Sequence, residues 1–147
     1  MNIDNTKIGI VGLGYVGLPL CLEFGKKYKT IGYDYDISRV NSLKKGLDYN
    51  LDIKNKKFKI TKNTSFSNKL SDLRECNFFI ISVPTPIDNK RLPDLTILKE
   101  VSKNIGKIIK HKDVIIFEST VYPGVTEEIC VPIIEKYSNL KYINEEN

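Results

Sequence analysis

The sequence predicts an α/β fold, a doubly wound parallel sheet in three layers, formed by one domain over residues 1–147. Strand-like and helix-like runs alternate along the whole chain, which is typical of a parallel sheet covered by helices. A glycine-rich turn at 12–17 joins the first strand-like run to the first helix-like run. The second strand-like run ends in an aspartate, Asp34. Each expected element has its own signal.

Buried strands are expected where short apolar runs end at glycine, proline or polar residues. Such runs are found at residues 7–11, 30–33, 78–83 and 114–117. At 57–61, Phe58 and Ile60 alternate with Lys57, Lys59 and Thr61, the period of a strand with one exposed side. We therefore expect the third strand of the sheet at 57–61, at an edge.

Helices are expected where apolar residues recur every three or four positions. The first spans about 15–27, and the second begins after a cap at Asp36 or Ser38 and stops at Gly46. A third follows a cap at Asp94, and a fourth runs over 125–137 with a kink at Pro132, which lacks an amide hydrogen. Residues 47–55 are polar and indicate no particular structure.

The chain has 147 residues, of which 41% are hydrophobic, enough for one compact core. Its net charge of +5 comes mainly from scattered lysines, and a cluster at 54–62 is interpreted as a solvated face. Aromatic residues are not interleaved with that cluster, so we expect no nucleic-acid partner. The apolar stretch 8–22 is too short to span a bilayer and contains several glycines, so we expect neither an export signal nor a membrane partner.

The three cysteines, Cys21, Cys76 and Cys130, form no CxxC pair and leave one unmatched. This pattern predicts neither a metal site nor a disulfide framework, and a reducing cytoplasm fits it best. Cys21 and Cys130 lie among apolar residues at helical spacing, so both are interpreted as packed core residues. His111 stands between lysines and is expected to be exposed in a loop.

Gly12, Gly14 and Gly17 form GxGxxG between a strand and a helix, the context in which this motif binds a dinucleotide. The first glycine permits the tight turn, the second lets backbone amides approach a pyrophosphate, and the third lets the helix pack closely on the strand. The pyrophosphate then lies at the positive end of the helix dipole. These residues predict a Rossmann-type nucleotide site.

Asp34 lies about 20 residues beyond Gly12, the offset at which a carboxylate reaches the hydroxyls of the adenosine ribose. A carboxylate there repels a 2′-phosphate, so NAD is favoured over NADP. The alternative is that Asp34 only starts the turn into the next helix. Arg39 is either a second contact near the adenosine or a solvated residue on a helix surface.

Two loops follow strands at the carboxyl edge of the sheet, where ligands of such folds bind. The first contains Pro84 and Thr85, and the second contains Ser119 and Thr120. We expect all four residues to contact the cofactor. The alternatives are a rigid proline loop for the first and capping of the next helix for the second.

Four ordered motifs carry a family resemblance: GLGYVGLPL at 12–20, GYDYD at 32–36, VPTP followed by PDLT, and ESTVYPGVTEEICVPIIE at 118–135. Together they resemble the UDP-glucose/GDP-mannose dehydrogenase family over nearly the whole chain. The YPG after EST looks most like the branch that acts on UDP-N-acetylhexosamines, whose products feed surface polysaccharides such as capsules. The resemblance implies NAD as the cofactor and two hydride transfers that oxidise the sugar C6 alcohol to a carboxylate.

By this resemblance Tyr15 and Val16 lie over the pyrophosphate, Asp34 and Arg39 flank the adenosine ribose, and Thr85 contacts the cofactor. Thr120 stands near the nicotinamide and is the one candidate catalytic residue in this chain. The family's catalytic cysteine, lysine and glutamate lie further along than residue 147. We therefore expect the substrate domain to be absent, this chain alone to be inactive, and the UDP-sugar to bind only with the remaining domains, in a homodimer.

A second hypothesis from another class is a stand-alone NAD(H)-sensing regulatory domain, which shares the length and the glycine motif. Such a domain has no need of VPTP or ESTVYPG. A substrate-binding domain encoded directly downstream would decide between the two hypotheses.

Overall fold

The computed structural model describes residues 5–49, 56–87 and 92–142. The chain forms two compact units, each described by itself here. The first contains Met1–Val83 with Asp113–Glu118, and the second contains Pro84–Lys112 with Ser119–Asn147.

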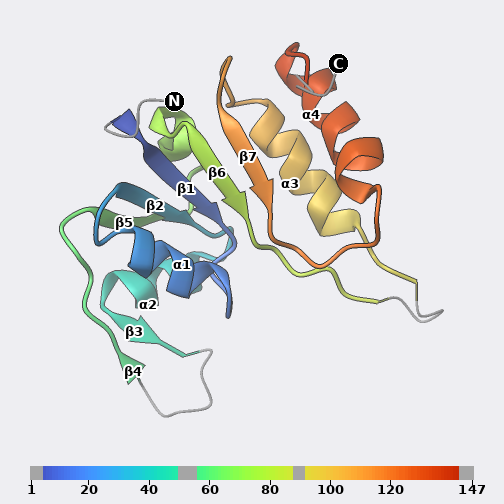
Figure 1. The fold of residues 1–147 in the computed structure, drawn as a ribbon. Helices are drawn as coiled ribbons and strands as arrows, with labels where there is room; N and C mark the ends of the chain where they lie inside the picture. Colours follow the sequence, from blue (N-terminus) through green and yellow to red (C-terminus); the bar gives the residue numbers. More distant parts are fainter. Residues whose placement is uncertain (1–4, 50–55, 88–91, 143–147) are drawn as a thin grey trace. The chain divides into compact units, whose positions relative to one another are not determined.

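The first unit is built on a five-stranded, fully parallel sheet with the order β5-β2-β1-β6-β7 (Figure 1). The strands are β1 (Lys7–Val11), β2 (Lys29–Tyr33), β5 (Thr64–Ser67), β6 (Phe78–Ile81) and β7 (Val114–Phe117). In sequence rank within this sheet the order reads third, second, first, fourth, fifth, which is the Rossmann order. Because the order reverses between β1 and β6, a ligand crevice is expected outside the carboxyl ends of these two strands.

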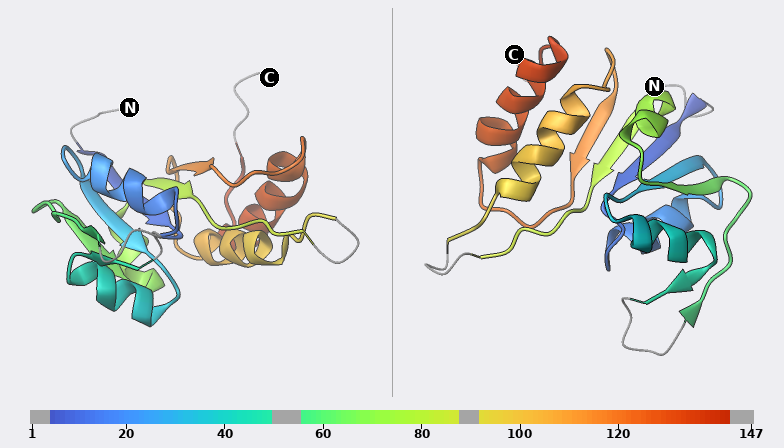
Figure 2. Two further views of the ribbon diagram at one scale, coloured as in Figure 1. Left: turned by 90° about the horizontal axis from the view of Figure 1, so that it is seen from below. Right: turned by 180° about the vertical axis from the view of Figure 1, so that it is seen from behind.

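Two helices pack against the part of this sheet formed by β1, β2 and β5 (Figures 1 and 2). They are α1 (Gly17–Phe24) and α2 (Ile37–Lys44). Alternate residues of the strands meet these helices, as the period of two requires. The resulting core cluster consists of Ile8, Ile10, Leu13, Leu18, Cys21, Val40, Leu43, Phe66 and Ile80. It holds the amino end of α1 against the carboxyl end of β1, where the glycine motif lies.

The cap of α2 is Asp36 rather than Ser38, because the Asp36 carboxylate accepts from the amides of Ser38 and Arg39. The helix ends just before Gly46, whose φ of +72° is the left-handed conformation that favours glycine at this position. The expected stop at Gly46 is therefore confirmed.

The second unit consists of α3 (Thr96–Gly106), α4 (Val131–Ser138) and the loops that flank them. The N-cap residue of α3 is Leu95, which makes no side-chain cap bond, so the cap expected at Asp94 lies one residue too early. The Asp94 carboxylate still accepts from the amide of Thr96, the first residue of the helix, at 2.9 Å. The two helices run side by side in both views of Figure 2, and a Cβ at Gly106 would lie 3.0 Å from the carbonyl oxygen of Ile134. Residues Thr126–Cys130, directly before α4, form a π-helix, which is wider than an α-helix. The helix expected over 125–137 is therefore irregular just before Pro132, where the sequence predicted a kink at Pro132 itself.

The third strand was predicted in the wrong place. Residues 58–61 form no strand, and only Lys56–Lys57 (β4) pair, antiparallel, with Leu47–Asp48 (β3) in a separate two-stranded sheet. The third strand of the main sheet is β5, whose sequence TSFS has one large apolar residue and therefore no visible alternation. Its buried hydroxyls are satisfied locally, since Thr61 bonds Thr64 and Ser67 donates to Asp72. The 3-10 helix η2 (Leu70–Glu75) was also not predicted.

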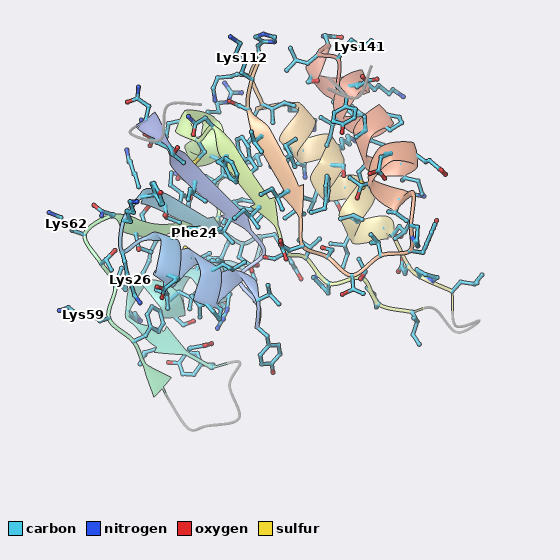
Figure 3. All side chains as sticks on the ribbon, in the orientation of Figure 1. Phe24, Lys26, Lys59, Lys62, Lys112 and Lys141 are labelled. Atoms are coloured by element: carbon cyan, nitrogen blue, oxygen red, sulfur yellow. The ribbon has the colours of Figure 1, made fainter. Side chains whose placement is uncertain are left out.

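Two lysines of the 54–62 cluster support its interpretation as a solvated face. Lys59 and Lys62 are exposed, and their side chains point away from the ribbon in Figure 3. Lys54 lies outside the described residues. His111 is exposed in a turn, as expected. In the described parts of the chain, no helix combines the length and apolar character needed to cross a membrane.

Candidate dinucleotide-binding site

The glycine turn leaves the carboxyl end of β1 at Gly12. This residue has φ +91°, and its amide donates to the carbonyl of Tyr33 at 2.9 Å. A Cβ here would lie 2.8 Å from the carbonyl oxygen of Ser82, which follows β6. Backbone conformation and space therefore both require glycine at this position.

Gly17 brings α1 against the same turn. A Cβ at Gly17 would overlap the carbonyl oxygen of Gly12 and the hydroxyl of Ser82. That hydroxyl donates to the Gly12 carbonyl at 2.9 Å, so helix, turn and the end of β6 meet at one point. This is the close helix-strand approach expected of the third glycine of the motif.

Gly14 is open where the other two glycines are crowded, since a Cβ there would have nothing within 4 Å. The helical bonds of α1 begin where the Leu18 amide donates to the Gly14 carbonyl at 3.2 Å, so the preceding amides belong to the uncapped helix start. Tyr15 and Val16 beside it are exposed by 70% and 51%. An open space at the amino end of a helix suits an anion such as a pyrophosphate.

Asp34 follows β2 at the same edge of the sheet and is half-buried. One carboxylate oxygen, Oδ2, accepts from the amide of Leu13 at 2.9 Å, and Oδ1 accepts from the amide of Asp36 at 3.0 Å. Each carboxylate oxygen has a second lone pair, so these bonds leave capacity for ribose hydroxyls. Asp34 thus starts the turn and also lies next to the glycine motif.

Arg39 is not a solvated surface residue, so that alternative is wrong. Its side chain is 8% exposed, and its Nε and Nη2 donate to the carbonyl of Leu13 at 3.0 and 2.7 Å. Its Nη1 pairs with the Asp48 carboxylate at 2.5 Å. Arg39 thus contacts the glycine motif by its hydrogen bonds to the Leu13 carbonyl.

The two loops of the second unit that are expected to bind the ligand, one with Thr85 and one with Thr120, are joined by a hydrogen bond. The Thr85 hydroxyl donates to the carbonyl of Thr120 at 2.7 Å, while Pro84 and Thr120 are exposed and Ser119 is half-buried. The Thr85 oxygen retains lone pairs for a ligand, because a hydroxyl donates once and accepts twice.

None of the three cysteines has the surroundings of a nucleophile, since all three are buried thiols outside any disulfide. Burial raises the pKa of the Cys21 thiol to about 12. Burial also raises the pKa of Cys130, more than its hydrogen bond with Ser102 lowers it. The core interpretation of Cys21 and Cys130 is confirmed, because a reactive cysteine needs a lowered pKa and access to solvent.

Two residues of this site were missed by the sequence reasoning. Ser82 is the one polar residue in the apolar run 78–83, near the carboxyl edge of the sheet, a position that could have marked it. Asp48 lies in the polar stretch 47–55, and no spacing rule connects it to Arg39 or to Leu13.

A Rossmann strand order, a three-glycine turn with its middle glycine open, and an acidic residue at the end of the second strand define the class of dinucleotide-binding domains. Residues 6–146 match the family model described as "UDP-glucose/GDP-mannose dehydrogenase family, NAD binding domain". This chain belongs to that family, as its NAD binding domain.

The chain is 50% identical over 140 residues to a UDP-N-acetyl-D-glucosamine 6-dehydrogenase from Pseudomonas aeruginosa, covering 95% of this chain and 33% of the relative. It is 47% identical over 136 residues to protein CapL of Staphylococcus aureus, covering 92% and 32%. Among solved structures, the UDP-D-ManNAc dehydrogenase of Pyrococcus horikoshii matches with a TM-score of 0.82 and 26% identity, over 93% of this chain and 34% of that one. The chain thus spans about a third of the length of these relatives. The hypothesis of a stand-alone regulatory domain is not supported by these matches.

Proposed function

We propose that this chain supplies the cofactor half of a UDP-N-acetylhexosamine 6-dehydrogenase. The observation that carries the proposal is the 50% identity to a UDP-N-acetyl-D-glucosamine 6-dehydrogenase across nearly the whole chain. The enzyme would oxidise the C6 alcohol of the UDP-sugar to the uronic acid. The similarity to CapL supports a place in the synthesis of a surface polysaccharide such as a capsule.

Binding of NAD(H) would use the residues around the glycine turn. The open space at Gly14 would receive the pyrophosphate beneath Tyr15 and Val16, next to the amides that start α1. Asp34 would accept hydrogen bonds from the adenosine ribose and repel a 2′-phosphate. The NAD held by these residues would supply the hydride acceptor for oxidation of the sugar carbon.

The loops of the second unit would contact the rest of the cofactor. In this proposal Pro84, Thr85 and Ser119 are cofactor contacts, and the Thr120 hydroxyl orients groups near the nicotinamide. The bond from Thr85 to the Thr120 carbonyl supports it, because that bond fixes the two loops relative to each other. Thr120 cannot act as the nucleophile of the second oxidation, and the buried thiols are unsuited to it. The reacting cysteine is therefore expected outside this chain.

The whole enzyme is proposed to be a cytoplasmic homodimer. The three cysteines form no disulfide, which fits a reducing compartment. Neither nucleic acid nor membrane is a proposed partner.

A domain exchange tests the proposal. The matching third of the P. aeruginosa UDP-N-acetyl-D-glucosamine 6-dehydrogenase is replaced by this chain, and NADH absorbance is followed with four sugars: UDP-N-acetylglucosamine, UDP-N-acetylgalactosamine, UDP-N-acetylmannosamine and UDP-glucose. We expect two NADH per sugar oxidised with a UDP-N-acetylhexosamine, and no turnover by the 147-residue chain alone. Two results would contradict the proposal. One is a chimaera that binds NADH but oxidises no UDP-sugar, and the other is turnover by the isolated chain with all three cysteines replaced by serine.

A further inference from the structure

Arg39 and Asp48 form a buried connection to the glycine turn that the dinucleotide fingerprint does not contain. Arg39 projects from α2, and its guanidinium divides its donors between two acceptors. Nε and Nη2 hold the Leu13 carbonyl, while Nη1 holds the Asp48 carboxylate. The side chains of Arg39 and Asp48 are each 8% exposed, so solvent screens this pair very little.

Leu13 is the residue between the first two glycines of the motif, and both of its peptide groups are held by charged side chains. Its amide donates to Asp34, and its carbonyl accepts from Arg39. In a trans peptide the carbonyl and the following amide point in opposite directions. The bond from Arg39 to the Leu13 carbonyl therefore directs the Gly14 amide away from Arg39. The orientation of that amide is set from inside the protein.

Asp48 determines where the Arg39 guanidinium lies. A buried guanidinium without a carboxylate partner is strongly disfavoured, and turning outward to water is its simplest relief. Asp48 belongs to β3, which pairs with β4, and the chain reaches it from α2 through the left-handed Gly46. The short β3-β4 sheet is thereby connected to the glycine turn through a single arginine.

We propose that Asp48 is a positioning residue for the bound dinucleotide: through Arg39 it fixes the Leu13-Gly14 peptide that faces the pyrophosphate. This inference rests on the proposed binding of NAD(H). By this inference the conformation of the glycine turn depends on two residues outside GxGxxG, Arg39 and Asp48. Arg39 thereby has a role that needs no direct contact with the adenosine.

The test compares two probes that differ in the pyrophosphate, ADP and adenosine, on the 147-residue chain. Asp48→Ala should weaken ADP binding roughly ten- to a hundredfold, the value of a lost bond to a charged group, and leave adenosine binding unchanged. Asp48→Asn keeps an oxygen acceptor for Arg39 and should recover most of the affinity for ADP. In a ¹⁵N-labelled sample the Gly14 amide resonance should shift in Asp48→Ala and return toward its original position in Asp48→Asn.

Glu75→Gln is the matched control, because that carboxylate also accepts from two basic side chains, Lys7 and Lys29, at the amino ends of β1 and β2. It should change neither affinity. Equal ADP binding by the wild type and Asp48→Ala would overturn the inference. So would an equal loss of ADP and adenosine binding in step with a lower melting temperature, which indicates a purely structural role. If Asp48→Ala does not fold, Asp48→Ser, whose side chain is one atom too short to replace the carboxylate, takes its place: a loss confined to ADP supports the inference and its absence overturns it. A wild-type chain that binds neither NADH nor ADP would instead refute the proposed function.

Discussion

Gly17 packs directly against the carbonyl oxygen of Gly12, and a Cβ at position 17 would overlap that oxygen. Only glycine therefore lets α1 lie this close to the end of β1. Gly17→Ala should therefore destabilise the chain by about 3 kcal/mol, the upper end of the usual cost of overpacking, because the overlap is with backbone. Urea unfolding followed by circular dichroism measures this. A loss below about 0.5 kcal/mol would show that the helix approaches the strand less closely than described.

Gly14→Val should give the opposite combination of effects. The space around Gly14 is open, so the fold should remain and the circular dichroism spectrum should be unchanged. NADH binding should be lost, since the new side chain occupies the region that the pyrophosphate needs. Calorimetry and thermal unfolding of the same sample check both halves. Retained NADH binding in a folded Gly14→Val chain would rule out the pyrophosphate site.

Two variants of Asp34 separate its charge from its bond to Leu13. Asp34→Ala removes both and should weaken NADH binding about ten- to a hundredfold. The difference between the affinities for NADH and NADPH should become smaller. Asp34→Asn keeps an oxygen acceptor for the Leu13 amide and loses only the charge. It should bind NADH more tightly than Asp34→Ala and discriminate less against NADPH than the wild type. Unchanged discrimination in both variants would remove Asp34 from the ribose site.

The cysteines should be inert in the folded chain. Alkylation with iodoacetamide at pH 8 is expected to be slow for Cys21, Cys76 and Cys130 and fast for all three in guanidinium chloride, because all three are buried. Mass spectrometry of the native and unfolded samples measures the difference. Rapid modification of any one of them in the native chain would contradict the core interpretation.

The raised pKa of Cys21 also sets a pH dependence of stability. The folded thiol stays neutral up to a pKa of about 12, while the unfolded thiol ionises near its ordinary value of 9.0. The stabilisation from burying the neutral thiol is therefore complete below pH 9 and falls by about 1.4 kcal/mol per pH unit between 9 and 12. Comparison with Cys21→Ala isolates this slope from other groups, and equal slopes in the two chains would contradict it.

The parts of the fold that the sequence predicts are those with local signals. Gly12 and Gly17 are recognisable because a turn and a close approach leave few residue types possible. The apolar runs of β1, β2 and β6 mark buried parallel strands, and that of β7 marks a half-buried one. The edge strand β5 was not predicted because it places only one large apolar residue, Phe66, in the core, and the rest of the strand pairs with β2 and makes hydroxyl bonds. One apolar residue gives no alternating pattern. Arg39 is similar: its burial depends on Asp48, which reaches it only through the fold.

Whether the glycine turn and Asp34 form a site for NAD(H) is decided by calorimetric titration of the 147-residue chain with NADH and with NADPH. The open pyrophosphate space at Gly14 and the carboxylate of Asp34 predict binding of NADH, with NADPH at least about tenfold weaker because its 2′-phosphate meets that carboxylate. Equal or tighter binding of NADPH, or no binding of either cofactor by the folded chain, would contradict the account.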